Sequence, residues 1–173
     1  MADSAPSPDE PRVSETLPNV LLVDGDDAWG YTIRRPEVWQ ARPLDVEGGH
    51  GVVFTPDPKA LDTMISVEIR DLGVVVWQRD LRDIETGFLN GLRAVPGSTI
   101  ERHKAYANEF AIGVDAVQTF SDGGVVRKRW IRLLHKKSRQ ARVIAQGATV
   151  AEYERLRPLF APCLTTFRLH DGV

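Results

Sequence analysis

Four alternating segments between residues 98 and 147, joined by short polar turns, constrain the fold more than any other feature of this sequence. The second and third segments are separated only by SDGG, and an Asp-Gly pair accepts the positive φ angles of a tight hairpin turn. A second polar turn, KKSRQ, separates the third segment from the fourth. Strands connected this tightly must be antiparallel. The sequence therefore predicts an antiparallel meander with strands at roughly 98–107, 110–120, 125–135 and 140–147.

Earlier segments predict additional strands. In MISVEIR, residues 64–70, the apolar side chains alternate with polar ones and share one face, as strand geometry requires. YTIR at 31–34 and GVVFT at 51–55 are shorter strand candidates. GVVVWQ, residues 73–78, is a continuous apolar run, and its pattern fits either a strand or a buried loop.

The periodicity changes in DLRDIETGFLNGLRAV, residues 80–95, where apolar side chains recur at steps of three and four. This pattern predicts an amphipathic helix, and Asp80 is placed to cap its N-terminus. Gly87 and Gly91 weaken such a helix by about 1 kcal/mol each relative to alanine. Their small size would allow the helix to approach a sheet closely.

A second helix is predicted near the C-terminus. Thr149 and Glu152 have the spacing of a capping box, and Pro158 should kink or split the helix that follows. Runs of strands with helices set apart are typical of the α+β class. Because VVF and ARVIA are apolar on both faces, the sheet should be covered on both sides. The predicted architecture is an α/β/α three-layer sandwich with a central antiparallel sheet.

The N-terminal segment differs from the rest. Residues 1–18 contain four prolines and few large apolar groups, so burial cannot offset the entropy of ordering them. The apolar stretch LPNVLLVD follows at 17–24, and it is either a strand of the domain or a docking arm for a partner. We favour the arm, which predicts an extended or disordered N-terminal arm at 1–28 and a folded domain at 29–173.

The residue types needed for catalysis are present but form no recognised motif. None of the four histidines lies in a nucleophile motif, and the single cysteine, Cys163, is most simply a small apolar residue of a helix. DGDD at 24–27 begins like a calcium loop, but Ala28 and Trp29 occupy positions that need an oxygen ligand and a glycine. EGGHG at 47–51 lacks the lysine of a phosphate loop. The sequence therefore predicts a protein without catalytic residues, metal or cofactor.

Charge is distributed unevenly along the chain. Residues 1–50 contain ten acidic residues and four arginines, whereas no acidic residue occurs between Gly124 and Ala145. Such a basic hairpin could bind an acidic protein or an anionic membrane surface. Alternatively, its lysines and arginines could protect a sheet edge from aggregation. The net charge of −2 and the single interleaved aromatic, Trp130, argue against nucleic acid. The basic side chains are Arg127, Lys128, Arg129, Arg132, His135, Lys136, Lys137, Arg139 and Arg142.

Four stretches resemble the PsbP-like superfamily, which includes the extrinsic PsbP protein of photosystem II and Ran-GTPase-binding relatives in nuclear import. They are GYTIRRPEVW, the pair VVFTPDP and ISVEIRDL, the meander AVQTFSDGGVVRKRWIRLLHKKSRQARVIAQGA, and the ending YERLRPLFAPCLTTFRL. The resemblance covers residues 29–169 and implies an α/β/α sandwich with a non-catalytic role. It also implies that Tyr31 and Ile33 join the sheet, that Pro36 turns the chain and that Trp39 fills an edge of the core.

The resulting functional hypothesis is a non-catalytic extrinsic or accessory subunit that docks on a larger, membrane-bound complex of the photosynthetic type. The alternatives are a soluble regulator that binds a GTPase or signalling protein, and a small-ligand-binding or hydrolytic domain with a pocket at His103 or His135. No stretch reaches the roughly 20 apolar residues of a membrane-spanning helix. If Met1 is the native start, we expect a cytoplasmic protein or one peripheral on the cytoplasmic side of a membrane. The predicted partner-binding residues are Leu17, Val20, Leu21, Leu22, Val23, Arg127, Lys128, Arg129, Arg132, Lys136, Lys137 and Arg139.

Overall fold

The computed structural model describes residues 20–171, which form two antiparallel sheets and two α-helices. The larger sheet has seven strands in the order β3-β4-β5-β9-β8-β7-β6, and the smaller has three in the order β1-β2-β10. The strands are β1 (Leu21–Asp26), β2 (Tyr31–Pro36), β3 (Gln40–Pro43), β4 (Gly49–Thr55), β5 (Met64–Asp71), β6 (Thr99–Ala107), β7 (Ile112–Asp122), β8 (Val125–Lys136), β9 (Arg139–Gly147) and β10 (Arg168–Leu169).

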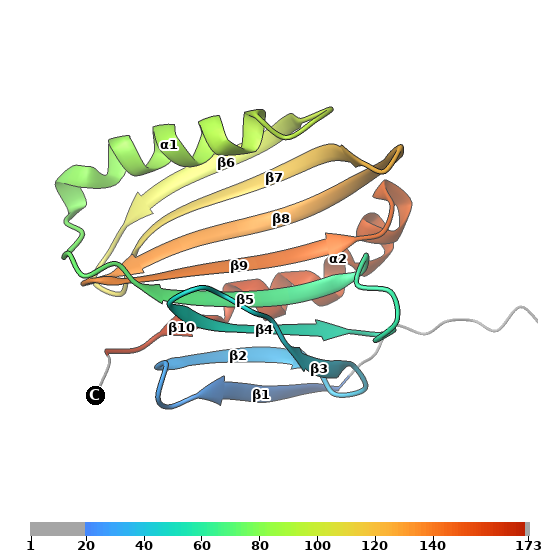
Figure 1. Ribbon diagram of the computed structural model, residues 1–173, viewed down its shortest axis with the longest axis horizontal. Coiled ribbons are helices and arrows are strands. Elements are labelled where there is room, and N and C mark those ends of the chain that lie inside the picture. The colour runs from blue at the N-terminus through green and yellow to red at the C-terminus, as the bar shows by residue number, and fades with distance from the viewer. Residues whose placement is uncertain (1–19, 172–173) are drawn as a thin grey trace, which may run out of the picture.

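Strands β6 to β9 form the antiparallel meander that the sequence predicts. Gly123 and Gly124 both have positive φ, 57° and 81°, so SDGG forms the tight β7–β8 turn. Lys137 also has a positive φ, 55°, in the β8–β9 turn. Strand β9 pairs on its other side with β5, which places β8 and β9 in the interior of the sheet (Figure 1).

Residues 21–26 are strand β1 of the smaller sheet and pair with β2 from Leu21 opposite Pro36 to Asp26 opposite Tyr31. This part of the chain therefore belongs to the folded domain, and the prediction of a separate arm is wrong for these residues. Pairing satisfies backbone hydrogen bonds that an extended arm would leave to water, and Leu21 also packs against the core. The rest of the expected arm, residues 1–19, lies outside the described residues.

Helix α1 (Leu81–Arg93) follows a 3₁₀ turn at Gln78–Asp80. The Asp80 carboxylate accepts a hydrogen bond from the backbone N–H of Trp77, so it holds the 3₁₀ turn rather than capping the α-helix. Within α1 the fully buried side chains are Leu89 and Leu92. A Cβ placed at Gly87 or Gly91 would meet no atom within 4 Å, so these glycines do not mark a close approach to the sheet.

Helix α2 (Val150–Thr165) begins where expected, since the Thr149 hydroxyl accepts a hydrogen bond from the N–H of Glu152 at 3.1 Å. Pro158 does not split this helix, which continues for another two turns beyond it. Pro158 lies on the exposed side of α2, where water can solvate the carbonyl that loses its partner, while the buried side remains packed.

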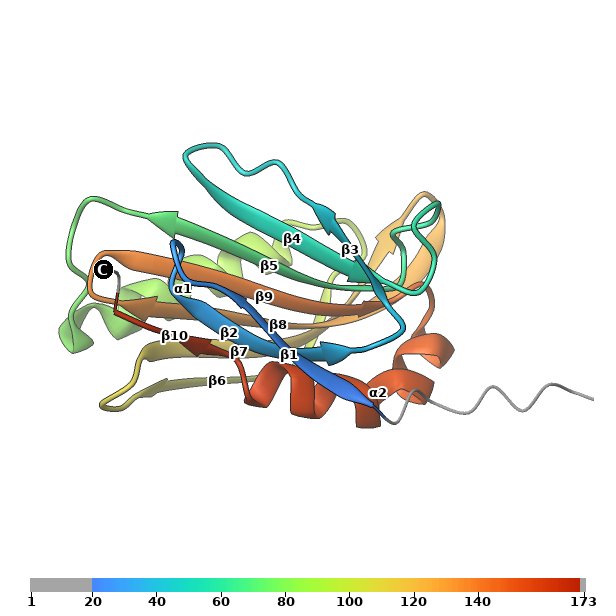
Figure 2. The same ribbon diagram turned by 90° about the horizontal axis from the view of Figure 1, so that it is seen from below.

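The elements form three layers, with the seven-stranded sheet in the middle. Helix α1 covers one face, which we call the α1 face, and α2 covers the opposite face together with the smaller sheet (Figures 1 and 2). Most of the core lies on this second face, the α2 face. Tyr31 and Ile33 are buried there in β2 of the smaller sheet, and the Trp39 ring lies edge-on to Phe160 with 6.3 Å between ring centroids. The predicted α+β sandwich is confirmed.

Candidate docking surface

The basic residues of β8 and β9 do not line an edge, because both strands have neighbours on either side. The edge-protection hypothesis for this basic hairpin is therefore wrong. Side chains alternate along a strand, so neighbouring bases of β8 point to opposite faces of the sheet. The structure consequently divides the predicted basic surface among several places instead of gathering it into one patch.

Arg127 and Lys128 are buried and ion-paired near the β7–β8 turn. The Arg127 guanidinium contacts carboxylates of Asp62 and Asp122 at 3.2 and 3.0 Å. The Lys128 ammonium lies 2.7 Å from a Glu101 carboxylate oxygen and 2.6 Å from one of Glu154. Although burial alone would lower the pKa of Lys128, its two carboxylate partners raise that pKa overall. These two cations connect elements within the domain.

Arg132 and Arg129 are half-buried on opposite faces of β8. The Arg132 guanidinium, on the α2 face, binds a carboxylate oxygen of Asp115 at 3.0 Å and the hydroxyl of Tyr106 at 2.6 Å, and it also donates to the carbonyl of Leu164. Arg129 lies on the α1 face and donates to the Gln118 side-chain carbonyl at 2.9 Å. Arg132 therefore links α2 to the sheet, and Arg129 lies beside Gln118 on the α1 face.

Lys136, Lys137 and Arg139 gather at the β8–β9 turn, at the end of the sheet opposite the β7–β8 turn (Figures 1 and 2). Both lysine ammonium groups approach the exposed carboxylate of Asp171, at 3.7 and 3.2 Å. Arg139 donates to the backbone carbonyl of His170 at 3.1 Å. Among the predicted basic residues, these three form one cluster, and Lys137 is its most exposed member.

Beside this basic turn, two loops expose large apolar side chains. No function was predicted for the first loop, residues 72–77, and the second loop, residues 108–111, was not identified from the sequence. Both lie at the same end of the sheet as the β8–β9 turn (Figure 1). We call this surface the loop end, and its apolar members are Leu72, Val74, Val75, Trp77 and Phe110, which are between 37% and 65% exposed.

The loops of the loop end are held by hydrogen bonds rather than by burial of their side chains. The backbone N–H groups of Leu72 and Val76 donate to the carbonyls of Ser138 and Lys137, at 2.7 and 2.9 Å. The Asn108 side-chain oxygen accepts from the N–H groups of Phe110 and Ala111. A shallow hollow of about 490 Å³ separates the loops, and Trp77, Phe110 and Lys137 all line it.

Exposed apolar side chains of this size are costly to solvate, and clusters of them are typical of protein-interaction sites. Aromatic residues are also enriched where protein interfaces carry most of their binding energy. The signal was present in the sequence, because GVVVWQ is a long apolar run that lacks the alternation of a strand with one solvated face. The sequence does not show that the second loop lies beside the first, because only the fold brings the two loops together.

The apolar residues of the predicted arm lie elsewhere. Leu22 and Val23 of β1, an edge strand of the smaller sheet, are 38% and 72% exposed, and Val20, just before this strand, is 53% exposed. Leu21 is half-buried against the core, and Leu17 lies outside the described residues. The structure therefore does not bring the predicted arm residues together with the basic turn.

The histidines are held by structural contacts. His103 Nδ1 lies 3.1 Å from a Glu85 carboxylate oxygen, in a surface ion pair that joins β6 to α1. His135 is buried, its Nε2 contacts the Gln140 amide, and burial lowers its pKa. His170 Nε2 contacts the Thr32 hydroxyl at 3.1 Å on an exposed surface. Within residues 20–171, no carboxylate orients the His170 ring for proton transfer to this hydroxyl.

Cys163 is fully buried in α2, and burial raises its pKa to about 12. Its thiol therefore stays protonated near neutral pH and is a poor nucleophile. No group of three or more histidine, cysteine, aspartate or glutamate side chains in the described part of the chain is arranged to hold a metal ion. Neither α1 nor α2, the helices of residues 20–171, is long and apolar enough to cross a membrane.

The sequence matches no protein-family model and no curated protein, but the fold matches solved structures. The cyanobacterial PsbP protein CyanoP of Synechocystis superposes with a TM-score of 0.63 and 16% identity over 91% of this chain and 96% of its own. LpqN of Mycobacterium tuberculosis, described as involved in cell envelope biogenesis, gives 0.58 and 13% over 88% and 90%. The yeast Ran-binding protein Mog1p gives 0.54 and 9% over 88% and 97%. This chain therefore has the PsbP-like fold that the sequence resemblance implied.

Proposed function

We propose that this chain is a non-catalytic accessory domain that binds a protein partner through the loop end. The observation that carries the proposal is the exposure of Trp77 and Phe110, 56% and 60%, on two separate loops that line one hollow. Burying two such rings in an interface would stabilise a complex by several kcal/mol, since a full side chain contributes about 1.5–3 kcal/mol. Lys137 at the rim adds a charge that would select an acidic partner surface.

The fold neighbours support a binding role of this kind. Mog1p is described as a Ran-binding protein, and CyanoP is a PsbP protein. Together with the family resemblance of the sequence, they suggest two hosts for this chain, a GTPase and a membrane-bound photosynthetic complex. The loop end would serve either host as a docking surface, and the cell fraction that contains the partner distinguishes between them.

The test uses the full chain as bait against native cytosol and detergent-solubilised membranes, at low and raised salt, with quantitative mass spectrometry. The double variant Trp77→Ala/Phe110→Ala should lose the partner by at least tenfold. The matched control, Val125→Ala/Val126→Ala, removes two valines that are 39% and 52% exposed at the opposite end of the sheet, and it should retain the partner. Equal capture by the parent and both variants would refute the proposal, provided that all three proteins have the same melting curve.

A further inference from the structure

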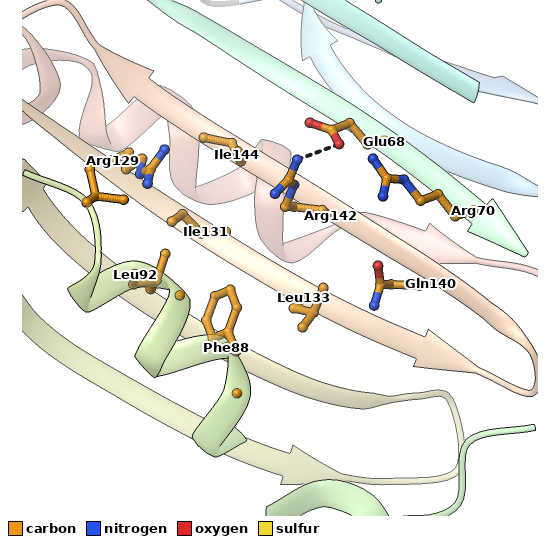
Figure 3. Close-up of a pocket in the computed structure, with 13 residues that line it drawn as sticks. Glu68, Arg70, Phe88, Leu92, Arg129, Ile131, Leu133, Gln140, Arg142 and Ile144 are labelled. Carbon is orange, nitrogen blue, oxygen red and sulfur yellow. Dashed lines mark hydrogen bonds and ion pairs between the residues drawn. The ribbon is translucent and has the colours of Figure 1, made fainter. Parts of the chain in front are cut away.

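The α1 face is only partly covered, and a groove remains beside the helix. Its volume is about 400 Å³, which is within the usual range for small-ligand sites. One wall is α1, and the floor is formed by β8, β9 and β5 (Figure 3). The loop end and this groove are separate surfaces, because none of the residues that line the groove lines the hollow between the loops.

The middle of the groove is apolar. Ile131 on β8 pairs directly with Ile144 on β9, and both side chains face the helix. Leu133 continues this floor along β8, while Phe88 and Leu92 of α1 form the facing wall (Figure 3). An aliphatic or aromatic body of a ligand would therefore find apolar contacts on two sides.

Guanidinium groups lie on both sides of this apolar stretch. Arg129 lies toward one end, half-buried, with its guanidinium carbon 4.4 Å from the centroid of the Phe120 ring. Arg142 and Arg70 lie toward the other end. Arg142 is paired with Glu68 at 2.6 Å, whereas Arg70 has no ion-pair or hydrogen-bond partner among the described residues.

The positive charge of the groove is therefore not balanced by the residues that line it. Three arginines face one carboxylate, Glu68. Among the described residues, Arg129 has the Gln118 amide as its hydrogen-bond partner and no carboxylate. Burial, and then the neighbouring charge of Arg142, lower the pKa of Arg129. A half-buried cation without a counter-charge is unfavourable, and a bound anion would relieve that cost.

The helix wall is also consistent with an open site. Gly87 and Gly91 lie one turn apart on α1 and line the groove, where added Cβ atoms would meet nothing within 4 Å. Each glycine lowers helix stability by about 1 kcal/mol relative to alanine, although alanine would fit. Larger side chains at these positions would fill the groove. The two glycines thus keep the groove wide at a measurable cost in stability.

We infer that this groove binds a small anionic amphiphile, with its apolar body on Ile131 and Ile144 and its oxyanion head at Arg129. The apolar floor and the unbalanced guanidinium together select this class of ligand. A neutral amphiphile would leave the charge of Arg129 unbalanced, and a polar anion would leave the apolar floor exposed to water. A carboxylate and a phosphate would both satisfy the guanidinium through paired N–H···O hydrogen bonds.

The test titrates the ¹⁵N-labelled full chain with decanoate, decyl phosphate and decanol, and follows backbone and arginine Nε–H signals by NMR. Decanoate or decyl phosphate should shift the signals of Arg129, Gly91 and Ile144, and the tighter of the two identifies the head group. Decanol should bind at least tenfold more weakly. Equal affinity for decanol, or shifts confined to other surfaces, would overturn the inference.

Two pairs of variants separate the groove from the fold. Arg129→Gln should weaken binding of the charged probes at least tenfold, whereas Arg93→Gln, which removes the same charge from an exposed position of α1, should not. Gly91→Leu should abolish binding by filling the groove and should leave the melting temperature unchanged or higher. Thr86→Leu adds the same side chain to α1 outside the groove and should bind normally. Unchanged binding by both Arg129→Gln and Gly91→Leu would refute the inference.

This inference does not depend on the proposed docking function. The loop-end variant Trp77→Ala/Phe110→Ala should bind the anionic probes as the parent does. Conversely, Gly91→Leu should still capture the protein partner. Failure of one proposal therefore leaves the other intact.

Discussion

The two faces of the central sheet are built from the same strands but are packed to different degrees. On the α2 face, α2 and the smaller sheet enclose a cluster of 20 buried residues. On the α1 face, the buried cluster has five residues and a groove remains beside the helix. Arg132 and Arg129 of β8 differ in the same direction, since Arg132 on the α2 face has a carboxylate partner and Arg129 on the α1 face does not. One face therefore encloses most of the core, and the other retains a groove and an arginine without a carboxylate partner among the described residues.

Two phenylalanines provide the most sensitive test of this comparison. Phe160 on α2 is fully buried and contacts Trp39 and Tyr153, so Phe160→Ala should lower the free energy of unfolding by about 3–5 kcal/mol. Phe88 on α1 is half-buried beside the groove, and Phe88→Ala should cost only about 1–2 kcal/mol. Urea denaturation measures both. Equal losses would show that the two faces contribute equally to stability.

Arg132 and Arg129 of β8 give the next largest difference. Arg132→Met should lower the unfolding free energy by about 3 kcal/mol, because it leaves the Asp115 carboxylate without its partner in a poorly solvated site. Arg129→Met should change stability by less than about 1 kcal/mol, since it removes a cation without a carboxylate partner. The same denaturation experiment applies. A larger loss for Arg129→Met would mean that its amide contact and ring contact hold the α1 face together.

Protonation of His135 should have the smallest effect on stability. His135 is an exception to the comparison of the two faces, because it is buried on the more open α1 face. Its Nδ1 atom has no hydrogen-bond partner among the described residues. Burial lowers its pKa below the ordinary value of 6.5. The unfolded chain therefore binds a proton more readily, so stability should fall as the pH drops below about 6.5, by at most about 1.4 kcal/mol per pH unit. In His135→Leu this part of the pH dependence should disappear. An unchanged slope between pH 7 and pH 5 would assign it to other groups.

Much of the fold could be predicted from the sequence because its signals are local. Alternation and the SDGG turn predicted the β7–β8 hairpin, and the apolar period predicted α1. The prediction was wrong for residues 21–26, where the apolar stretch pairs with β2. The residues LLVDGD do not by themselves show whether the segment pairs with another strand or stays extended and unpaired. The hydrogen bonds that decide this come from the neighbouring strand β2.

The candidate sites were harder to predict, because each depends on which face or end a side chain occupies. The run of basic residues in β8 suggested one surface, but successive side chains point to opposite faces, and Arg127 and Lys128 meet acids from distant parts of the chain. The loop end joins two loops that are about thirty residues apart, and the groove joins α1 to three strands. The spacing of residues along the sequence does not predict these contacts between distant segments.

The sequence by itself determined the antiparallel meander, the amphipathic period of α1 and the capped start of α2, because the contacts that specify them lie within a few residues. Tertiary structure alone decided which charges are neutralised, which apolar residues remain exposed and which face of the sheet stays open. These outcomes depend on long-range pairing, such as that of β5 with β9, which brings Glu68 to Arg142 and leaves Arg129 without an acid. Burial and charge balance are properties of neighbours in space, and chain order alone does not specify those neighbours.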